Sequence, residues 1–135
     1  MTTVDLDQLG DRLDAAADAI GPAIERRMKH VGTLGVGKIK ANASGRPGPM
    51  VRNSAVPNYR DSWKDAHHPI PHGAMCTIGT TKPQGRRLEF GYWDMTDSIG
   101  RHFFQPAYPH VQPALPFIGA VLREQMGLAV EEVLA

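Results

Sequence analysis

The 135-residue sequence predicts a single α+β domain, in which N-terminal helices and a C-terminal helix pack on a small antiparallel sheet with long loops. Three observations predict this class. Apolar residues recur every three or four positions near both ends, as on one face of a helix. A short run over 74–80 has the character of a strand. Eleven prolines and fourteen glycines, most of them within 45–116, make the middle rich in turns.

The first 43 residues are predicted to be helical. An apolar stripe over 6–20, with Asp5 as the N-cap, marks one face of an amphipathic helix. Gly21-Pro22 interrupts this stripe, and because proline is tolerated in a first helical turn, a second helix is expected to begin there. Its own stripe runs over 24–39. Three glycines in this stretch either weaken the helix or let another element approach closely: Gly32, Gly35 and Gly37.

Residues 44–58 are predicted to form a basic loop, because Gly45-Arg46-Pro47-Gly48-Pro49 suits neither a helix nor a central strand. The loop carries Arg46 and Arg52 and no acidic residue, and Arg60 follows it. These three arginines are the candidate residues of a loop that faces a partner or a DNA-filled lumen. The alternative interpretation is a solvated connector.

Residues 59–105 are predicted to hold the sheet. The stretches 59–66 and 74–80 are expected to pair as an antiparallel hairpin with a long loop between them. In the second strand, Cys76 and Ile78 share one face because side chains alternate along a strand.

A short helix is predicted near 83–90, and Gly91 supplies the left-handed conformation that commonly stops a helix. This turn joins the two halves of the domain. A loop over 93–100 is expected to follow it, and 101–105 could then add a third, short strand.

The surface of this short helix gives a candidate subunit interface. One helical turn places Leu88 towards the core and its charged neighbours towards water or a partner. The candidate interface residues are Arg86, Arg87, Glu89 and Trp93.

Residues 106–135 are predicted to form the C-terminal helix, which begins near His110 or Val111. Pro113 fits a first turn, whereas Pro116 should bend the helix or delay its start. Apolar positions of this helix combine with those in the middle of the chain to give the predicted core. The candidate core residues are Ile78, Leu88, Phe90, Leu115, Ile118 and Leu122.

Charge is segregated along the chain, although the net charge is only +1. Residues 1–25 hold six acids and one base, whereas 26–60 hold eight bases and no acid. Residues 61–110 hold five of each, and 111–135 hold three acids and one base. The basic block can bind a polyanion, or it can bind the acidic block of a neighbouring copy.

Candidate metal ligands cluster in the middle of the chain. His67, His68 and His72 lie within six residues and Cys76 follows them, and both residue types bind zinc. Their spacing matches no standard zinc module, so a solvated loop and a weak pH response are the alternatives. No cofactor or bound metal is expected, and the role of the histidines stays open.

The remaining patterns argue against catalysis. Glu89, Asp94 and Asp97 have no matching acid elsewhere and are expected to be surface charges. The serines and glycines form neither a nucleophile elbow nor a phosphate-binding fingerprint. A single cysteine excludes an intrachain disulfide and fits a reducing compartment. The sequence also contains no signal peptide and no apolar run near the about 20 residues of a membrane span.

Three groups of residues, in this order, resemble a family of small neck or tail-completion proteins of long-tailed bacteriophages, the gene-product-ten-like tail components. The likeness covers roughly residues 20–125, and the specificity comes from the order and spacing of the groups. The groups are Gly45-Arg46-Pro47-Gly48-Pro49 with Asn58-Tyr59-Arg60-Asp61-Ser62-Trp63, then Ile78-Gly79-Thr80 with Arg87-Leu88-Glu89-Phe90-Gly91, and then Gln105-Pro106 with Pro109-His110-Val111-Gln112-Pro113-Ala114-Leu115.

The resemblance implies a structural virion protein that is made in the host cytoplasm and is found at the head–tail junction. It implies a homo-oligomeric ring, six-fold or twelve-fold, between the head connector and the tail tube. Neighbouring connector and tail proteins would be its partners, and DNA would pass through the lumen without sequence-specific contact. Such a protein performs no chemistry and needs no cofactor or membrane.

Three alternatives remain at this point. A tail terminator, which caps the tail tube, belongs to the same class. A basic nucleic-acid-binding module would use the cations of 26–60 for salt-dependent phosphate contacts, although no recognition element is evident. A small metal-dependent hydrolase would use the histidine cluster. A stable ring without DNA would favour the structural class. Salt-sensitive DNA binding by a monomer would favour the nucleic-acid-binding module, and stoichiometric zinc with activity would favour the hydrolase.

Overall fold

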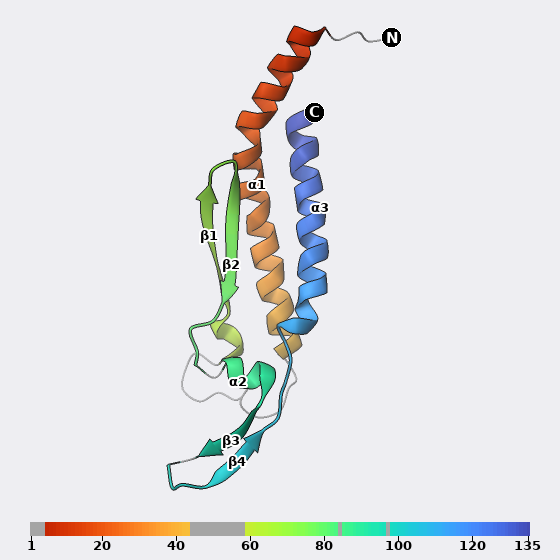
Figure 1. The fold of residues 1–135 in the computed structure, drawn as a ribbon. Coiled ribbons are helices and arrows are strands. Elements are labelled where there is room, and N and C mark those ends of the chain that lie inside the picture. Colours follow the sequence, from red (N-terminus) through yellow and green to blue (C-terminus); the bar gives the residue numbers. More distant parts are fainter. Residues whose placement is uncertain (1–4, 44–58, 84, 97) are drawn as a thin grey trace.

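The computed structural model describes residues 5–43, 59–83, 85–96 and 98–135. Within them the predicted α+β class is confirmed, with three α-helices and two separate two-stranded antiparallel sheets. The two long helices, α1 (Leu6–Ala43) and α3 (Leu115–Leu134), lie side by side, and the hairpin β1–β2 runs along α1 (Figure 1). Helix α2 (Gly85–Phe90) and the hairpin β3–β4 lie beyond one end of the helical pair.

Helix α1 is one continuous helix of 38 residues, so the predicted break at Gly21-Pro22 is wrong. A proline inside a helix removes one hydrogen bond. Packing offsets this loss, because Ala23 is fully buried and the tip of the β1–β2 hairpin lies against Gly21, where a Cβ would be 3.5 Å from the backbone of Gly73. The predicted N-cap is confirmed, since Asp5 Oδ1 accepts a hydrogen bond of 2.7 Å from the backbone N–H of Gln8.

The first hairpin pairs β1 (Lys64–Ile70) with β2 (Gly73–Gly79). The long loop predicted between the strands is instead a tight turn, because β1 continues through Pro69, whose missing N–H is tolerated on an edge strand. His72 accommodates this turn with a φ of 58°. The inward faces of the strands approach α1 at Gly32 and Gly35, and a Cβ on Gly35 would lie 2.6 Å from Ile78 Cδ1. These two glycines therefore permit close approach of the hairpin, whereas a Cβ on Gly37 would meet nothing within 4 Å.

The short helix predicted near 83–90 is confirmed as α2, and Gly91 ends it with a φ of 80°. The loop predicted over 93–100 is wrong in part, because β3 (Tyr92–Thr96) pairs antiparallel with β4 (His102–Gln105). The irregular register between Tyr92 and Met95 explains why this strand lacks a clear alternating pattern. This hairpin projects away from the helices (Figure 1).

The chain enters α3 through the 3-10 helix η3 (Gln112–Ala114). Pro116 then occupies one of the first two positions of α3, so its predicted effect of delaying the helix start is confirmed. No helix in the described ranges is long and apolar enough to cross a membrane.

The core lies where α1, the end of β2, α2 and η3 meet. Leu88 is 1% exposed, and Ile78 and Ile118 pack against the buried cluster as predicted. The buried cluster consists of Val36, Ile39, Ala43, Tyr59, Trp63, Leu88 and Ala114.

Three core predictions are wrong, because Phe90, Leu115 and Leu122 are 71%, 55% and 37% exposed. Phe90 is the last residue of α2 and lies past the face that carries Leu88. In α3 the buried positions are Val121 and Ala129, so the inward face is offset by one residue from the predicted stripe. Apolar residues on both faces of α3 conceal this offset in the sequence.

Candidate functional site

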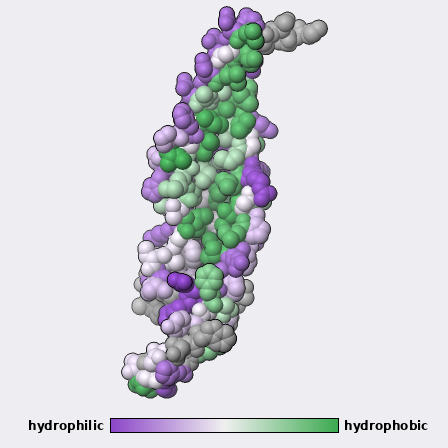
Figure 2. Space-filling model, viewed as in Figure 1, coloured by the Kyte–Doolittle hydropathy of each residue, from purple (hydrophilic) through white to green (hydrophobic). Residues whose placement is uncertain are grey.

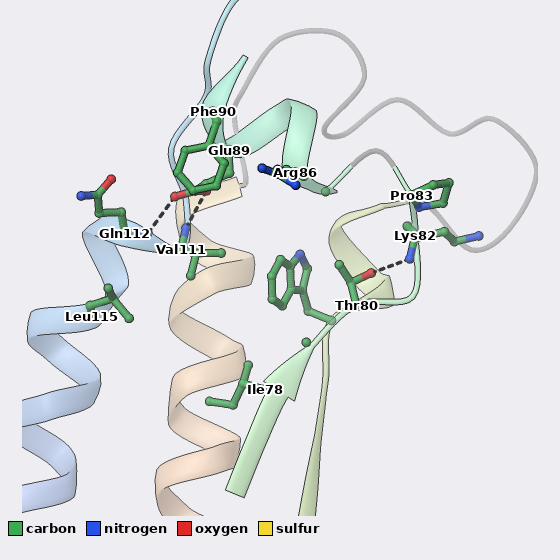
Figure 3. A pocket seen from close by; sticks show the side chains of 13 residues that line it. Ile78, Thr80, Lys82, Pro83, Arg86, Glu89, Phe90, Val111, Gln112 and Leu115 are labelled. Carbon is green, nitrogen blue, oxygen red and sulfur yellow. Dashed lines mark hydrogen bonds between the residues drawn. The ribbon is translucent and has the colours of Figure 1, made fainter. Parts of the chain in front are cut away.

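A groove of about 640 Å³ lies between the end of β2, helix α2 and the start of α3. Its walls are largely apolar, with Ile78 at one end and the exposed side chains of Phe90 and Leu115 at its margins (Figure 3). Two cationic residues, Lys82 and Arg86, also line it. The groove therefore combines apolar contact area with positive charge, which suits an acidic amphipathic segment.

One wall of the groove is fixed by Glu89, whose carboxylate accepts three backbone hydrogen bonds. The donors are the N–H groups of His110, Val111 and Gln112, at 2.9, 3.0 and 2.9 Å. Figure 3 shows the bonds from Val111 and Gln112. These are the N–H groups that the start of a helical segment leaves unpaired, and the negative charge suits that position. The prediction that Glu89 faces water or a partner is wrong, since it is 8% exposed.

The surroundings of Glu89 set its ionisation. Burial by itself would raise the pKa of the carboxyl, but the backbone donors of His110, Gln112 and Val111 and the nearby His110 side chain outweigh burial and hold the pKa below its ordinary value. Glu89 is therefore held as a carboxylate that connects α2 to η3.

A second polar chain lies behind Glu89. The Tyr59 hydroxyl is 2.7 Å from His110 Nε2, and His110 Nδ1 is 2.8 Å from the Tyr108 carbonyl oxygen and 2.9 Å from Glu89 Oε2. Burial, reinforced by the charge of Glu89, raises the pKa of Tyr59 to about 12. Trp63 packs edge-on against both rings, with centroids 6.3 and 5.7 Å away.

These groups include an acid, an imidazole and a phenol, as in many catalytic sites. However, Tyr59 is 3% exposed and His110 is completely buried, so a substrate could not reach them. The contact between the Tyr59 hydroxyl and His110 instead links two segments that lie 51 positions apart in the sequence. Sequence reasoning missed this network because no local spacing links Tyr59 to His110.

The other predicted interface and loop residues have mixed outcomes. Arg86 and Arg87 are exposed on α2, where a partner can reach them. Arg60 lies 3.3 Å from the Asp61 carboxylate. Arg46 and Arg52 fall outside the described residues, as does the side chain of Trp93.

Part of the basic block is engaged within the chain. Arg26 and Arg27 both pair with Glu132 of α3, Arg27 at 3.3 Å, and Arg27 also bonds to Gln125 at 3.4 Å. The hydrogen bond from Arg26, with Arg27 nearby, lowers the pKa of Glu132. Lys38 lies 5.4 Å from the ring centroid of Phe117, within range of a cation–π contact. These cations hold α1 against α3, and binding to nucleic acid would compete with that role.

The two long helices bury residues of small and medium size and expose most of their leucines. The residues buried on α1 are Ala16, Ala23, Val31, Gly32, Gly35, Val36, Ile39 and Ala43, and those buried on α3 are Val121 and Ala129. Those exposed on the same two helices include Leu6, Leu9, Leu13, Leu34, Leu115, Phe117, Leu122, Val130 and Leu134. Figure 2 shows apolar surface running along the helical pair. We call these exposed side chains the open apolar face.

The histidines predicted as a cluster are separated by the strand geometry. His67 pairs across the hairpin with Cys76 and shares its inward face, whereas His68 and His72 are exposed. Asp65, which the sequence did not single out, joins His67 and Cys76.

Comparison with known proteins found no match to the sequence among protein-family models or curated proteins, and no match among solved structures.

Proposed function

We propose that the protein is a structural component of the head–tail junction of a long-tailed bacteriophage. In this role, copies of the chain form a homo-oligomeric ring that completes the neck and joins the head connector to the tail tube around the DNA channel. The ordered motifs that resemble the neck and tail-completion family suggest the location. The open apolar face is the observation that carries the proposal of assembly.

The argument from the open apolar face is energetic. Each fully buried leucine-sized side chain stabilises a structure by about 1.5–3 kcal/mol relative to its exposed state. An amphipathic helix in a monomer normally places its largest apolar residues inward. Here the buried positions of the two long helices are alanines, glycines, valines and one isoleucine, whereas none is a leucine and most leucines of both helices are exposed. Large exposed apolar patches mark interaction surfaces, and a second copy provides the apolar partner that this face needs.

Charge favours a second copy as the occupant. The N-terminal arm, residues 6–21 of α1, carries acidic residues among its exposed leucines. The start of the arm projects past the end of α3 (Figure 1), and Leu9 and Leu13 line a pocket with Val133 and Leu134. The groove between α2 and α3 offers Lys82 and Arg86 beside exposed Phe90 and Leu115. The acidic, apolar arm of one copy therefore complements the cationic, apolar groove of the next. A contact between two different surfaces closes into a ring when the rotation between copies permits it.

A tail terminator would use the same surfaces and remains the second candidate within this class. The nucleic-acid module is less favoured, because Arg26 and Arg27 already pair with Glu132. A structural rather than enzymatic role fits the burial of Tyr59 and His110.

Electron cryomicroscopy of phage particles that contain the chain tests the location. We expect density for the chain in a ring around the DNA channel between head and tail. Density at the end of the tail tube beyond the neck would identify the terminator instead. Particles that lack the chain would overturn both.

A charge-swap experiment tests the proposed contact between copies. Lys82→Glu with Arg86→Glu should reduce assembly at least tenfold, and Asp7→Lys with Asp11→Lys in the arm should restore it when both pairs are combined. Native mass spectrometry of the chain, mixed with the other neck proteins, measures the fraction of chains that has assembled. Full assembly of the groove variant, or failure of the arm variant to restore it, would contradict the proposed pairing of arm and groove.

A further inference from the structure

The inward face of the β1–β2 hairpin brings together three different metal-ligating side chains. Asp65 and His67 are two residues apart on β1 and so point to the same side, and the register places Cys76 of β2 opposite His67. One ligand atom from each residue lies within 4.8 Å of the other two. All three residues are partly buried.

Gly32 of α1 faces this cluster and leaves the space in which the side chains converge. A Cβ on Gly32 would lie 2.5 Å from Asp65 Oδ2, 2.8 Å from His67 Cε1 and 2.9 Å from Cys76 Sγ. The three groups thus surround a single point next to the helix backbone. Zinc ligands lie about 2.0–2.3 Å from their ion, so small movements of the side chains would bring all three to ligand distance, and a water molecule would take the fourth position.

One of the two imidazole nitrogens of His67 has no hydrogen-bond partner among the described residues. His67 Nε2 lies 2.6 Å from Asp65 Oδ2, so the nitrogen in question is Nδ1, which is buried. Buried polar atoms of this kind are uncommon in folded proteins, and a bound ion or water is one explanation for them.

We propose that Asp65, His67 and Cys76 bind one Zn²⁺ ion, which cross-links β1 to β2 on the face of the hairpin that packs against α1. The mixture of carboxylate, imidazole and thiolate favours zinc over magnesium or calcium, because the latter two prefer oxygen ligands. One carboxylate, one thiolate and a neutral imidazole balance the charge of the ion. Binding requires the thiolate, so the proton of the Cys76 thiol is released to solvent as the Zn–S bond forms.

The test uses the purified full chain, reduced and stripped of metal, titrated with ZnCl₂ and separately with CoCl₂. We expect one zinc ion per chain to remain after desalting, and cobalt to produce a sulfur-to-metal charge-transfer band. The melting temperature should rise by about 4 °C or more when zinc is in large excess over its dissociation constant.

Three variants and a matched control decide the outcome. Cys76→Ser should abolish the charge-transfer band, and His67→Gln and Asp65→Asn should each lower zinc affinity at least tenfold. The control, His68→Gln, changes the neighbouring exposed histidine and should bind zinc like the parent. Absence of zinc binding by the parent, or retention of binding in both His67→Gln and Cys76→Ser, would overturn the proposal. Circular dichroism of each metal-free variant, equal to that of the parent, excludes misfolding as the cause.

Discussion

The two halves of α1 belong to one continuous helix but lie in different surroundings. In the N-terminal arm only Ala16 is buried among the described residues, whereas the half from Pro22 to Ala43 buries seven residues against the hairpin, α3 and the core. The arm exposes Leu6 by 85%, Leu9 by 45% and Leu13 by 54%. The packed half meets neighbouring elements through glycine, alanine, valine and isoleucine.

If the proposed ring forms, this difference separates the residues that stabilise the monomer from the residues that join one copy to the next. The packed half has its partners within the chain, including the core around Leu88. The arm carries leucines at helical spacing, which is the pattern of a helix that is buried, yet little of the described chain covers them. We infer that changes in the core should lower the stability of the monomer, and that changes in the arm should impair assembly.

The largest expected effect on stability is at Leu88. Leu88→Ala should lower the free energy of unfolding by about 2–5 kcal/mol, because it leaves a cavity under a side chain that is 1% exposed. Phe90→Ala, two residues away and 71% exposed, should cost less than about 0.5 kcal/mol. Urea denaturation of both variants measures the difference, and equal losses would show that the assignment of the core is wrong.

Glu89→Gln should cost about 1.5–3 kcal/mol at neutral pH, because the charged acceptor of three backbone N–H groups is lost. The folded pKa of Glu89 lies below its ordinary value of 4.5, so the stability from its charge is complete above pH 4.5 and is lost as pH falls through the folded pKa. Unfolding measured from pH 7 to pH 3 should show the parent approaching the variant. A constant gap over this range would contradict the ionised state of Glu89.

A pair of glycine substitutions compares the two halves of α1 directly. Gly32→Ala should destabilise by about 1–3 kcal/mol, because its Cβ would lie within 3 Å of three side chains. Gly10→Ala in the arm should stabilise by about 0.5–1 kcal/mol, since its Cβ meets nothing within 4 Å and alanine favours a helix. Thermal unfolding of both variants checks the opposite signs, and the same sign would remove the distinction between the halves.

The smallest expected effect on the monomer is in the arm itself. Leu9→Asn with Leu13→Asn should change the free energy of unfolding by less than about 0.5–1 kcal/mol, because both side chains are about half exposed. If the proposed ring forms, the same variant should lower phage titre in complementation at least tenfold. Thr33→Asn, an exposed change in the packed half, is the control and should leave the titre unchanged. A large loss of monomer stability in the arm variant would show that the arm belongs to the core.

Local signals predicted the secondary structure well. Asp5 caps α1, Gly91 ends α2, and Pro116 delays α3, because each depends on the chemistry of one or two residues. The antiparallel pairing of the first hairpin was also predicted, but its first strand was placed at 59–66, whereas β1 is Lys64–Ile70 and Arg60–Ser62 form a 3-10 helix. Continuity of α1 through Pro22 was missed, since it depends on contacts with the hairpin tip and α3 that no local pattern reveals.

Burial was harder to predict than secondary structure. Helix α3 is apolar on more than one face, so the stripe through Leu115 and Leu122 was predicted to face inward, whereas the buried positions are Val121 and Ala129. Glu89 was predicted to be exposed because an acid on a short helix usually is, and the backbone donors that bury it follow 21 to 23 positions later. The candidate metal ligands were predicted as three histidines and Cys76. Asp65 was missed, and His68 and His72 lie apart, because strand pairing decides which of these side chains meet.

Pro22 lies at the boundary between the arm and the packed half. Since a proline lacks the N–H that would bond to the carbonyl four residues earlier, the helix is least resistant to bending at this position. A ring that joins two structures of different diameter needs subunits that can adjust their shape. If the proposed ring forms, bending of α1 at Pro22 would let the arm follow a neighbouring copy while the metal-ligand cluster and the core keep their geometry.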